Sequence, residues 1–168
     1  MSEHSAGILV YKYVGRKLEV MLAHPGGPFW VKKDIASWSI PKGLIENGED
    51  TISAARREFE EETGHKIENE LTELGTIKQP SKKQITIYAV EMDIDVEHVK
   101  SNFFEMEWPP KSGNMQKFPE NDKAEWFSIE LAREKIFKGQ IGFLDKLVEL
   151  LDYKECKDEE YNQLSLFD

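Results

Sequence analysis

The sequence predicts a mixed α/β (α+β) domain in which the β-sheet lies between helices. Three observations support this fold class: two strand-like runs flank a turn near the N-terminus, one amphipathic helix follows at residues 51–63, and two helical segments follow the last strand-like run. Strands and helices in this order favour a sheet that is covered on both faces. The 168 residues suit a single domain, which we place at residues 1–154, followed by a charged tail at residues 155–168.

Composition and charge limit the classes of partner. Apolar residues make up 39% of the chain, and the formal net charge is −10. A chain this acidic is a poor general binder of nucleic acid or of an anionic membrane, so we expect neither interaction. The N-terminus lacks the basic segment and apolar core of a signal peptide, and the lone Cys156 cannot form an internal disulfide. We therefore expect a cytoplasmic protein, and the sequence leaves open whether it forms a homodimer.

The first strands are predicted to form a β-hairpin. Residues 5–13 and 18–24 are β-rich, and the residues between them form a turn that contains Gly15. A third, short strand is predicted at residues 38–40, where Pro41 ends it.

A long loop connects the hairpin to this short strand. It begins at Pro25, reaches Ser37 and combines Trp30 with Lys32 and Lys33. Aromatic and basic side chains together suit a loop that faces a ligand. The alternative is a surface insertion in which Trp30 packs on the core, and the sequence does not distinguish the two.

The helix at residues 51–63 has recognisable ends. Asp50 is a good N-cap, and Gly64 is a good residue to follow the last turn. At about 100° per residue, Ile52, Ala55 and Phe59 fall on one stripe. We expect this stripe to face the core.

Three acidic residues, Glu58, Glu61 and Glu62, share the face beside that stripe. Like charges at spacings of three and four residues repel, so the helix gains nothing from them unless a cation binds there. Arg57 projects near Glu61 and can partly neutralise it. Carboxylates without His or Cys select Mg²⁺ or Mn²⁺ over Zn²⁺, and such ions polarise phosphoryl oxygens and clamp a polyphosphate. A solvated acidic face is the alternative, and the position of the acids beside the apolar stripe favours the cation site.

The remaining elements are predicted from local patterns. Residues 97–106 fit neither a strand nor a helix clearly, and prolines stiffen a loop at residues 108–114. The predicted elements are strands at residues 71–78, 84–93 and 124–127, a helix at residues 129–138 that Ser128 caps, and a helix at residues 141–153.

The central residues resemble the sequence motif of a known family. The spacing of glycine, glutamate and arginine resembles the Nudix box, GX5EX7REUXEEXGU, and the similarity to Nudix hydrolases extends over residues 5–153. Its last position departs from the pattern, because His65 stands where the family prefers an aliphatic residue. The resemblance implies the Nudix α/β/α sandwich with a mixed sheet, and hydrolysis of a nucleoside diphosphate linked to another moiety. The matching residues are Gly43, Glu49, Arg57, Glu58, Glu61, Glu62 and Gly64.

The resemblance also implies roles for individual residues. Glu58, Glu61, Glu62 and the carbonyl of Gly43 would bind Mg²⁺ or Mn²⁺, and Arg57 and Glu49 would support them. A further family glutamate, a metal ligand or general base, lies six residues before a tryptophan. Glu120 holds that position before Trp126, and Asp122 and Glu125 are its rivals. The implied catalytic residues are Glu61, Glu62, Glu120 and Arg57.

The substrate is predicted less directly. Residues 38–43 are similar to the corresponding run of asymmetric diadenosine polyphosphate hydrolases. The alternatives are a nucleoside triphosphate pyrophosphohydrolase that cleans the nucleotide pool, and a Nudix domain that senses a nucleotide without cleaving it. Lysines would hold phosphates as point charges, and an aromatic side chain would stack on a base. The predicted substrate-binding residues are Trp30, Lys32, Lys33, Lys42, Lys111 and Lys117.

The C-terminal tail carries a second resemblance. Gln163–Phe167 reads QLSLF, which looks like the peptide by which bacterial replication and repair proteins dock on the sliding clamp. The alternative is that its apolar side chains pack on this domain or on a second subunit. The sequence favours the alternative modestly, because short motifs recur by chance.

Overall fold

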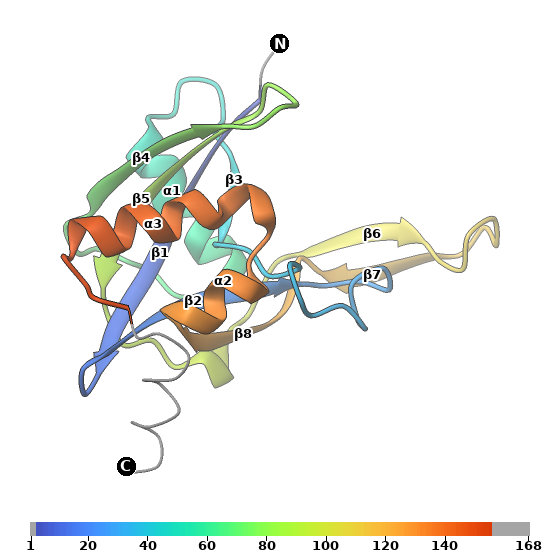
Figure 1. Ribbon diagram of the computed structural model, residues 1–168. Helices are drawn as coiled ribbons and strands as arrows, with labels where there is room; N and C mark the ends of the chain where they lie inside the picture. The colour runs from blue at the N-terminus through green and yellow to red at the C-terminus, as the bar shows by residue number, and fades with distance from the viewer. Residues whose placement is uncertain (1–2, 156–168) are drawn as a thin grey trace, which may run out of the picture.

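The structure, a computed structural model, describes residues 3–155 as a sheet between two helical layers (Figure 1). The strands are β1 (His4–Val14), β2 (Lys17–Pro25), β3 (Lys42–Leu44), β4 (Thr72–Lys78), β5 (Gln84–Glu91), β6 (Phe103–Glu107), β7 (Met115–Pro119) and β8 (Asn121–Ser128). The helices are α1 (Thr51–Thr63), α2 (Ile129–Lys135) and α3 (Ile141–Leu150), with short 3₁₀ turns η1 (Val96–His98) and η2 (Lys138–Gln140). The predicted α/β/α fold class is confirmed.

The main sheet is mixed, as predicted. Its strand order is β4-β5-β1-β2-β8, and β3 also pairs with β1. β1 and β5 run parallel, whereas the other pairs are antiparallel. β1 divides its other edge between two partners, because Ser5–Gly7 pair with β3 and Tyr11–Val14 pair with β2. The sheet therefore branches beside the residues that carry the sequence motif.

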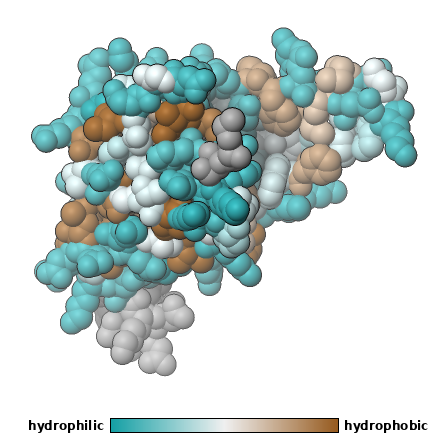
Figure 2. Space-filling view, turned by 90° about the horizontal axis from the view of Figure 1, so that it is seen from above, coloured by the Kyte–Doolittle hydropathy of each residue, from teal (hydrophilic) through white to brown (hydrophobic). Residues whose placement is uncertain are grey.

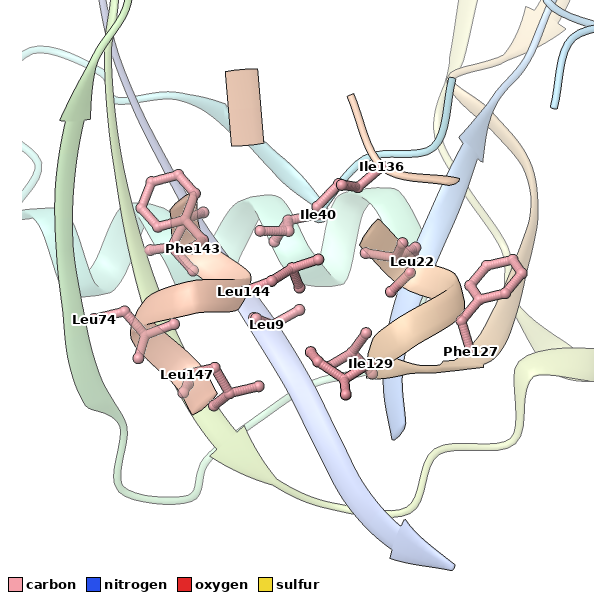
Figure 3. Close-up of a cluster of buried hydrophobic side chains, with 14 of the residues drawn as sticks. Leu9, Leu22, Ile40, Leu74, Phe127, Ile129, Ile136, Phe143, Leu144 and Leu147 are labelled. Atoms are coloured by element: carbon pink, nitrogen blue, oxygen red, sulfur yellow. The ribbon is translucent and has the colours of Figure 1, made fainter. Parts of the chain in front are cut away.

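Hydrophobic side chains cover both faces of the sheet. Ile8 and Val10 of β1 belong to the cluster that packs against α1, whereas Leu9, between them, belongs to the cluster beneath α2 and α3. This alternation follows from the strand period of two residues. Figure 3 shows the second cluster, in which Leu144 of α3 and Ile129 of α2 lie over Leu9. No helix within residues 3–155 is long and apolar enough to span a bilayer.

Helix α1 has the predicted bounds and caps. Asp50 accepts a hydrogen bond from the amide of Ser53 at 2.7 Å, and Gly64 closes the helix in the left-handed conformation. The expected apolar stripe is wrong in one position, because Ile52 is 44% exposed. The buried face of the helix begins at Ala54 and runs through Phe59 to Thr63, whereas Ile52 and Ser53 near its start face solvent.

The main difference from prediction is a projecting β-hairpin. β6 begins within the unassigned segment 97–106 and ends one residue beyond it, β7 was not predicted, and the two strands pair in a separate two-stranded sheet. The hairpin extends away from the body as an arm (Figures 1 and 2), on which Figure 2 shows hydrophobic as well as hydrophilic residues. Its side chains are mostly exposed, including Phe103 and Met115, so neither strand has the pattern of a buried face.

Other boundaries differ for local reasons. Residues 42–44 pair with β1, whereas Trp38 and Ser39 form only isolated bridges instead of the predicted strand. Helix α2 ends three residues earlier than predicted, because its last backbone groups bond to Trp38 instead of continuing the helix. The amide of Trp38 donates to the carbonyl of Lys135, and the carbonyl of Trp38 accepts from the amide of Phe137. Helix α3 ends at Leu150, and Asp152 beyond it has a positive φ.

Candidate active site

A cavity of about 430 Å³ opens where α1, β3 and the base of the β6–β7 hairpin meet. Helix α1 contributes carboxylates from its second half, β3 contributes a lysine and a glycine, and the two ends of the hairpin contribute one residue each. The cavity therefore unites segments that are far apart in the sequence. Its lining residues are Lys42, Gly43, Leu44, Glu58, Glu61, Glu62, Asn102 and Glu120.

Gly43 provides room for one of these carboxylates. A Cβ built on Gly43 would lie 2.0 Å from Oε2 of Glu58, which is far inside a van der Waals contact. The absence of a side chain therefore lets the Glu58 carboxylate lie directly against β3. Burial raises the pKa of Glu58, while the hydrogen bond from Arg57 opposes this rise.

Arg57 organises the outer side of the acidic cluster. Its guanidinium binds both oxygens of Glu49, at 2.8 and 2.9 Å, and donates to Glu58 at 2.8 Å and to Glu61 at 3.1 Å. It also donates to the carbonyl of Leu44 at 3.0 Å. The hydrogen bonds from Arg57 lower the pKa of Glu49 to about 2, and those to Glu49 and Glu58 raise the pKa of Arg57. One planar cation thus fixes the motif loop and two carboxylates of α1 relative to one another.

Glu62 lies on the inner side of the cluster. The side-chain amide of Asn121 donates to its Oε2 at 2.9 Å. Burial raises the pKa of Glu62 to about 7; Asn121 and Lys42 oppose this shift, and the charges of Glu58 and Glu120 add to it. Burial also lowers the pKa of Lys42, against the attraction of Glu62. The inner cavity therefore holds carboxylates whose charges are only partly compensated.

Glu120 is the one member of the predicted trio of later acids that lines the cavity. Its amide donates to the carbonyl of Asn102 at 2.7 Å, and its carbonyl accepts from Gly26 at 2.9 Å. The rival Asp122 contacts His24 instead, and the rival Glu125 lies along β8 opposite Leu22. The geometry thus favours Glu120 for the role that the sequence assigned to it.

The predicted substrate-binding residues are not all brought together. Lys42 lines the cavity. Trp30 packs edge-to-face on Phe137, with 5.4 Å between the ring centroids. The ammonium of Lys33 lies 4.9 Å from the centroid of the Trp30 ring. Both rings are half-buried and belong to neither hydrophobic cluster, so the two interpretations of this loop stay open. The remaining three are exposed and lie outside the lining: Lys32 in the loop after β2, Lys111 in the turn of the hairpin and Lys117 in β7.

The donor set of the cavity fits a hard divalent cation. Four carboxylate side chains and Gly43 line one space, and carboxylate and carbonyl oxygens are the ligands that such ions prefer. Within residues 3–155, however, no three side chains already stand close enough to hold an ion. Arg57 and Asn121 hold three of the carboxylates in hydrogen bonds instead. Binding of a cation therefore requires these carboxylates to leave their present hydrogen bonds and turn toward the ion.

A family model for the NUDIX domain matches residues 2–147 of the sequence. The chain belongs to the Nudix family. It is a pyrophosphohydrolase of nucleoside diphosphate-linked substrates, and divalent metal ions are the cofactors of Nudix hydrolases. The comparison with curated proteins gives no match.

Solved structures agree with the Nudix fold. A C. elegans Ap4A hydrolase binary complex is 21% identical, with a TM-score of 0.60, over 88% of this chain and 98% of that one. The NUDIX domain of Shewanella oneidensis NrtR complexed with ADP ribose is 14% identical, with a TM-score of 0.61, over 90% and 89%. A MutT protein from Methanosarcina mazei Go1 is 17% identical, with a TM-score of 0.60, over 91% and 96%. At these identities the likeness concerns the fold alone.

Three residues of the site were not singled out from the sequence. Asn102 lines the cavity, Asn121 holds Glu62, and His24 binds Asp122. Asn121 and His24 each contact a partner far away in the sequence, and Asn102 joins Glu61 and Glu120 through backbone hydrogen bonds, so no local spacing identifies them. The position of Asn121 directly after Glu120 was the one available signal.

Proposed function

We propose that this Nudix hydrolase cleaves a pyrophosphate linkage within a nucleoside polyphosphate, with a diadenosine polyphosphate as the substrate and Mg²⁺ or Mn²⁺ as the cofactor. The observation that carries this proposal is the grouping of four carboxylates, Gly43 and Lys42 around one cavity. Polyphosphates are anionic, so an acidic cavity binds them only when cations are present. The similarity of residues 38–43 to asymmetric diadenosine polyphosphate hydrolases favours the dinucleotide.

The residues of the cavity have different roles in this proposal. Glu58, Glu61, Glu62, Glu120 and the Gly43 carbonyl would hold the divalent ions, which would polarise phosphoryl oxygens and lower the pKa of a bound water. Arg57 orients Glu58 and Glu61, and Asn121 orients Glu62. Lys42 offers its ammonium to a phosphate as a point charge.

Glu120 is also suited to accept a proton from the attacking water. Of the four carboxylates in the cavity, it is the one with no hydrogen bond or ion pair to another side chain within residues 3–155. A carboxylate free of such bonds retains its full acceptor capacity. This supports Glu120 as either a metal ligand or a general base.

A substrate panel with product identification tests the proposal. The native chain and Glu62→Gln are assayed with Mg²⁺ or Mn²⁺ on a diadenosine polyphosphate, nucleoside triphosphates and ADP-ribose. We expect a mononucleotide and a nucleoside triphosphate from diadenosine tetraphosphate, and a loss of at least about 100-fold in Glu62→Gln. Glu60→Gln is the matched control, because Glu60 lies exposed on the same helix outside the cavity.

The same panel separates the alternatives. Inorganic pyrophosphate released from triphosphates, with little action on the dinucleotide, would support a pyrophosphohydrolase of the nucleotide pool. Tight nucleotide binding without turnover would support a nucleotide sensor. Undiminished turnover in Glu62→Gln would remove the catalytic role of the acidic helix face.

The sliding-clamp peptide at Gln163–Phe167 lies outside the described residues and stays a prediction. A pull-down on a bacterial sliding clamp, with the full chain and with a chain that ends at Asn162, tests it. Equal retention of both would remove the idea. The homodimer and the cytoplasmic location also stay predictions, which size-exclusion chromatography and cell fractionation can test.

A further inference from the structure

The segment that carries Glu120 and Asn121 is held by the end of β2. The pairing of β2 with β8 shifts register between His24 and Pro25, and the amide of Gly26 then donates to the carbonyl of Glu120 at 2.9 Å. A Cβ on Gly26 would lie 1.9 Å from the carbonyl oxygen of Pro119, so only glycine permits this approach. The backbone on one side of the cavity is therefore set by β2.

His24 adds a side-chain contact to this backbone contact. It is 1% exposed, and its Nδ1 lies 2.9 Å from Oδ1 of Asp122. Its Nε2 lies 2.6 Å from the carbonyl oxygen of Lys33, and its ring meets that of Trp38 at 5.0 Å between centroids. A carbonyl oxygen only accepts, so Nε2 carries a proton, and one further proton lies between Nδ1 and the carboxylate.

These two bonds lock the imidazole in place. Any rotation of the ring would break both bonds and leave buried polar atoms without partners, which costs about 1–3 kcal/mol per atom. His24 thus connects two segments that are separate in the sequence, the loop after β2 through Lys33 and the start of β8 through Asp122.

The contacts continue from Asp122 into the cavity. Asp122 directly follows Asn121, whose amide holds Oε2 of Glu62 at 2.9 Å, and it is two residues from Glu120. A shift of Asp122 would therefore move both the residue that orients Glu62 and a predicted ligand. Asp122 itself is absent from the cavity lining within the described chain, so it does not act there directly.

We propose that the His24–Asp122 pair is a positioning device for the metal site, which sets Glu120 and Asn121 against the carboxylates of α1 and ties them to the loop that follows β2. This inference rests on the proposed function, because it takes Glu62 and Glu120 as ligands. Groups that orient metal ligands change metal affinity or activity by about 10–100-fold when removed. Loss of the His24–Asp122 contact should therefore change metal affinity or activity by a similar factor.

Variants of Asp122 test the proposal, because its side chain is 30% exposed and belongs to neither hydrophobic cluster. We expect Asp122→Ala to weaken Mn²⁺ binding and to lower kcat, each by about 10-fold or more. Electron paramagnetic resonance measures the Mn²⁺ binding. Asp122→Asn should restore both to within about threefold, because an amide N–H can donate to Nδ1 while Nε2 stays protonated. If the pair served stability alone, Asp122→Ala would lower Tm but leave Mn²⁺ affinity unchanged, and Asp122→Asn would have no affinity to restore.

The chain offers a matched control. His98 and Asp95 form another His–carboxylate pair, which is exposed and outside the cavity lining. His98→Ala should leave Mn²⁺ affinity and kcat unchanged. His24→Phe, which keeps the ring volume and removes both bonds, should repeat the effect of Asp122→Ala. Native Mn²⁺ affinity and kcat in Asp122→Ala would overturn the proposal.

A double-mutant cycle with Glu120→Gln identifies the route of action. If the pair acts by placing Glu120 and its neighbour, Asp122→Ala should weaken Mn²⁺ binding less in the Glu120→Gln background than in the native chain. Independent effects in the cycle would contradict the proposal. Mn²⁺ binding without hydrolysis by the native chain would contradict only the proposed function, whereas no Mn²⁺ binding would overturn both.

Discussion

The carboxylate of Glu58 occupies the space in which a side chain on Gly43 would lie. A Cβ at that position would come within 2.0 Å of Oε2 and 2.1 Å of the carboxyl carbon. These atoms are the end of a flexible side chain, so the fold can relieve the clash cheaply by rotating the carboxylate away. The same rotation would remove a predicted ligand from the cavity. Gly43 is therefore required by the site rather than by the fold.

Gly43→Ala should impair metal binding with little loss of stability. We expect Mn²⁺ affinity and kcat to fall by about 10-fold or more, because one carboxylate is displaced. Titration with Mn²⁺, steady-state kinetics and Tm are the measurements. Gly142→Ala is the control, since its Cβ would also meet a flexible side-chain end, the Cδ1 of Ile77, away from the cavity. Native kinetics in Gly43→Ala would show that the close approach has no functional consequence.

Arg57→Lys should separate the geometry of the guanidinium from its charge. A lysine keeps the positive charge but cannot bind Glu49 with two parallel bonds while reaching Glu58 and Glu61. We expect kcat to fall by about 10-fold and the free energy of unfolding by roughly 1–2 kcal/mol, since bonds between charged groups are lost.

A neighbouring arginine provides the comparison for Arg57. Arg56 donates two hydrogen bonds, to the carbonyls of Ile67 and Asn69, outside the carboxylate cluster. Arg56→Lys should lower the free energy of unfolding to a similar extent and leave kcat unchanged, as measured by urea unfolding and steady-state assays. Equal losses of kcat in both variants would indicate a general effect of destabilising α1.

The parts of the fold and site that could be predicted are those set by local spacing. The bounds of α1 depend on Asp50 and Gly64 at its own ends, and the acidic face depends on residues three and four apart. The hairpin β6–β7 could not be predicted in this way, because its strands bury little and lack a continuous apolar face. The sequence also could not show that the first turn of α1 leaves Ile52 in solvent, since tertiary packing decides this.

The contacts that were missed join residues far apart in the chain. Asn121 reaches Glu62 and His24 reaches Asp122 across most of the domain. The His24–Asp122 contact exists because β2 and β8 are neighbours in the sheet, and the Asn121–Glu62 contact exists because the start of β8 lies beside the end of α1. The spacing within any one of these segments does not determine either contact. Trp30 illustrates the converse, because its aromatic character suited a ligand and the structure packs it on Phe137.

Lysine variants should lose less activity the farther the lysine lies from the cavity. The sequence assigned phosphate contacts to both Lys42 and Lys111, but Lys42 lines the cavity and Lys111 lies in the turn of the projecting hairpin. We expect Lys42→Gln to lower kcat/KM by about 10–100-fold, because a bond to a charged phosphate is worth about 1.5–3 kcal/mol. Lys111→Gln should have a smaller effect, and Lys66→Gln, which removes an exposed charge that pairs with Glu68, should have none. A larger loss in Lys111→Gln would place the phosphates on the hairpin.

The pH dependence of stability should report on Glu62. Burial raises its pKa from 4.5 to about 7, so the folded chain holds this proton more tightly than the unfolded chain. The resulting contribution to stability is complete below about pH 4.5 and is lost as the pH rises through 7. In the absence of divalent ions, the loss amounts to roughly 3 kcal/mol. The pKa of Glu49 is lowered to about 2, so its contribution to stability changes with pH in the opposite direction. That contribution is lost as the pH falls below about 4.5.

Unfolding of the native chain and of Glu62→Gln between pH 4.5 and 8, with chelator present, measures this contribution. The native free energy of unfolding should fall with pH relative to that of the variant, because glutamine does not titrate. Added Mn²⁺ should reverse the native trend above pH 7, where it binds the ionised carboxylate and stabilises the folded state by mass action. Parallel pH curves for the two chains would contradict the raised pKa, and equal stabilisation of both by Mn²⁺ would contradict the assignment of Glu62 as a ligand.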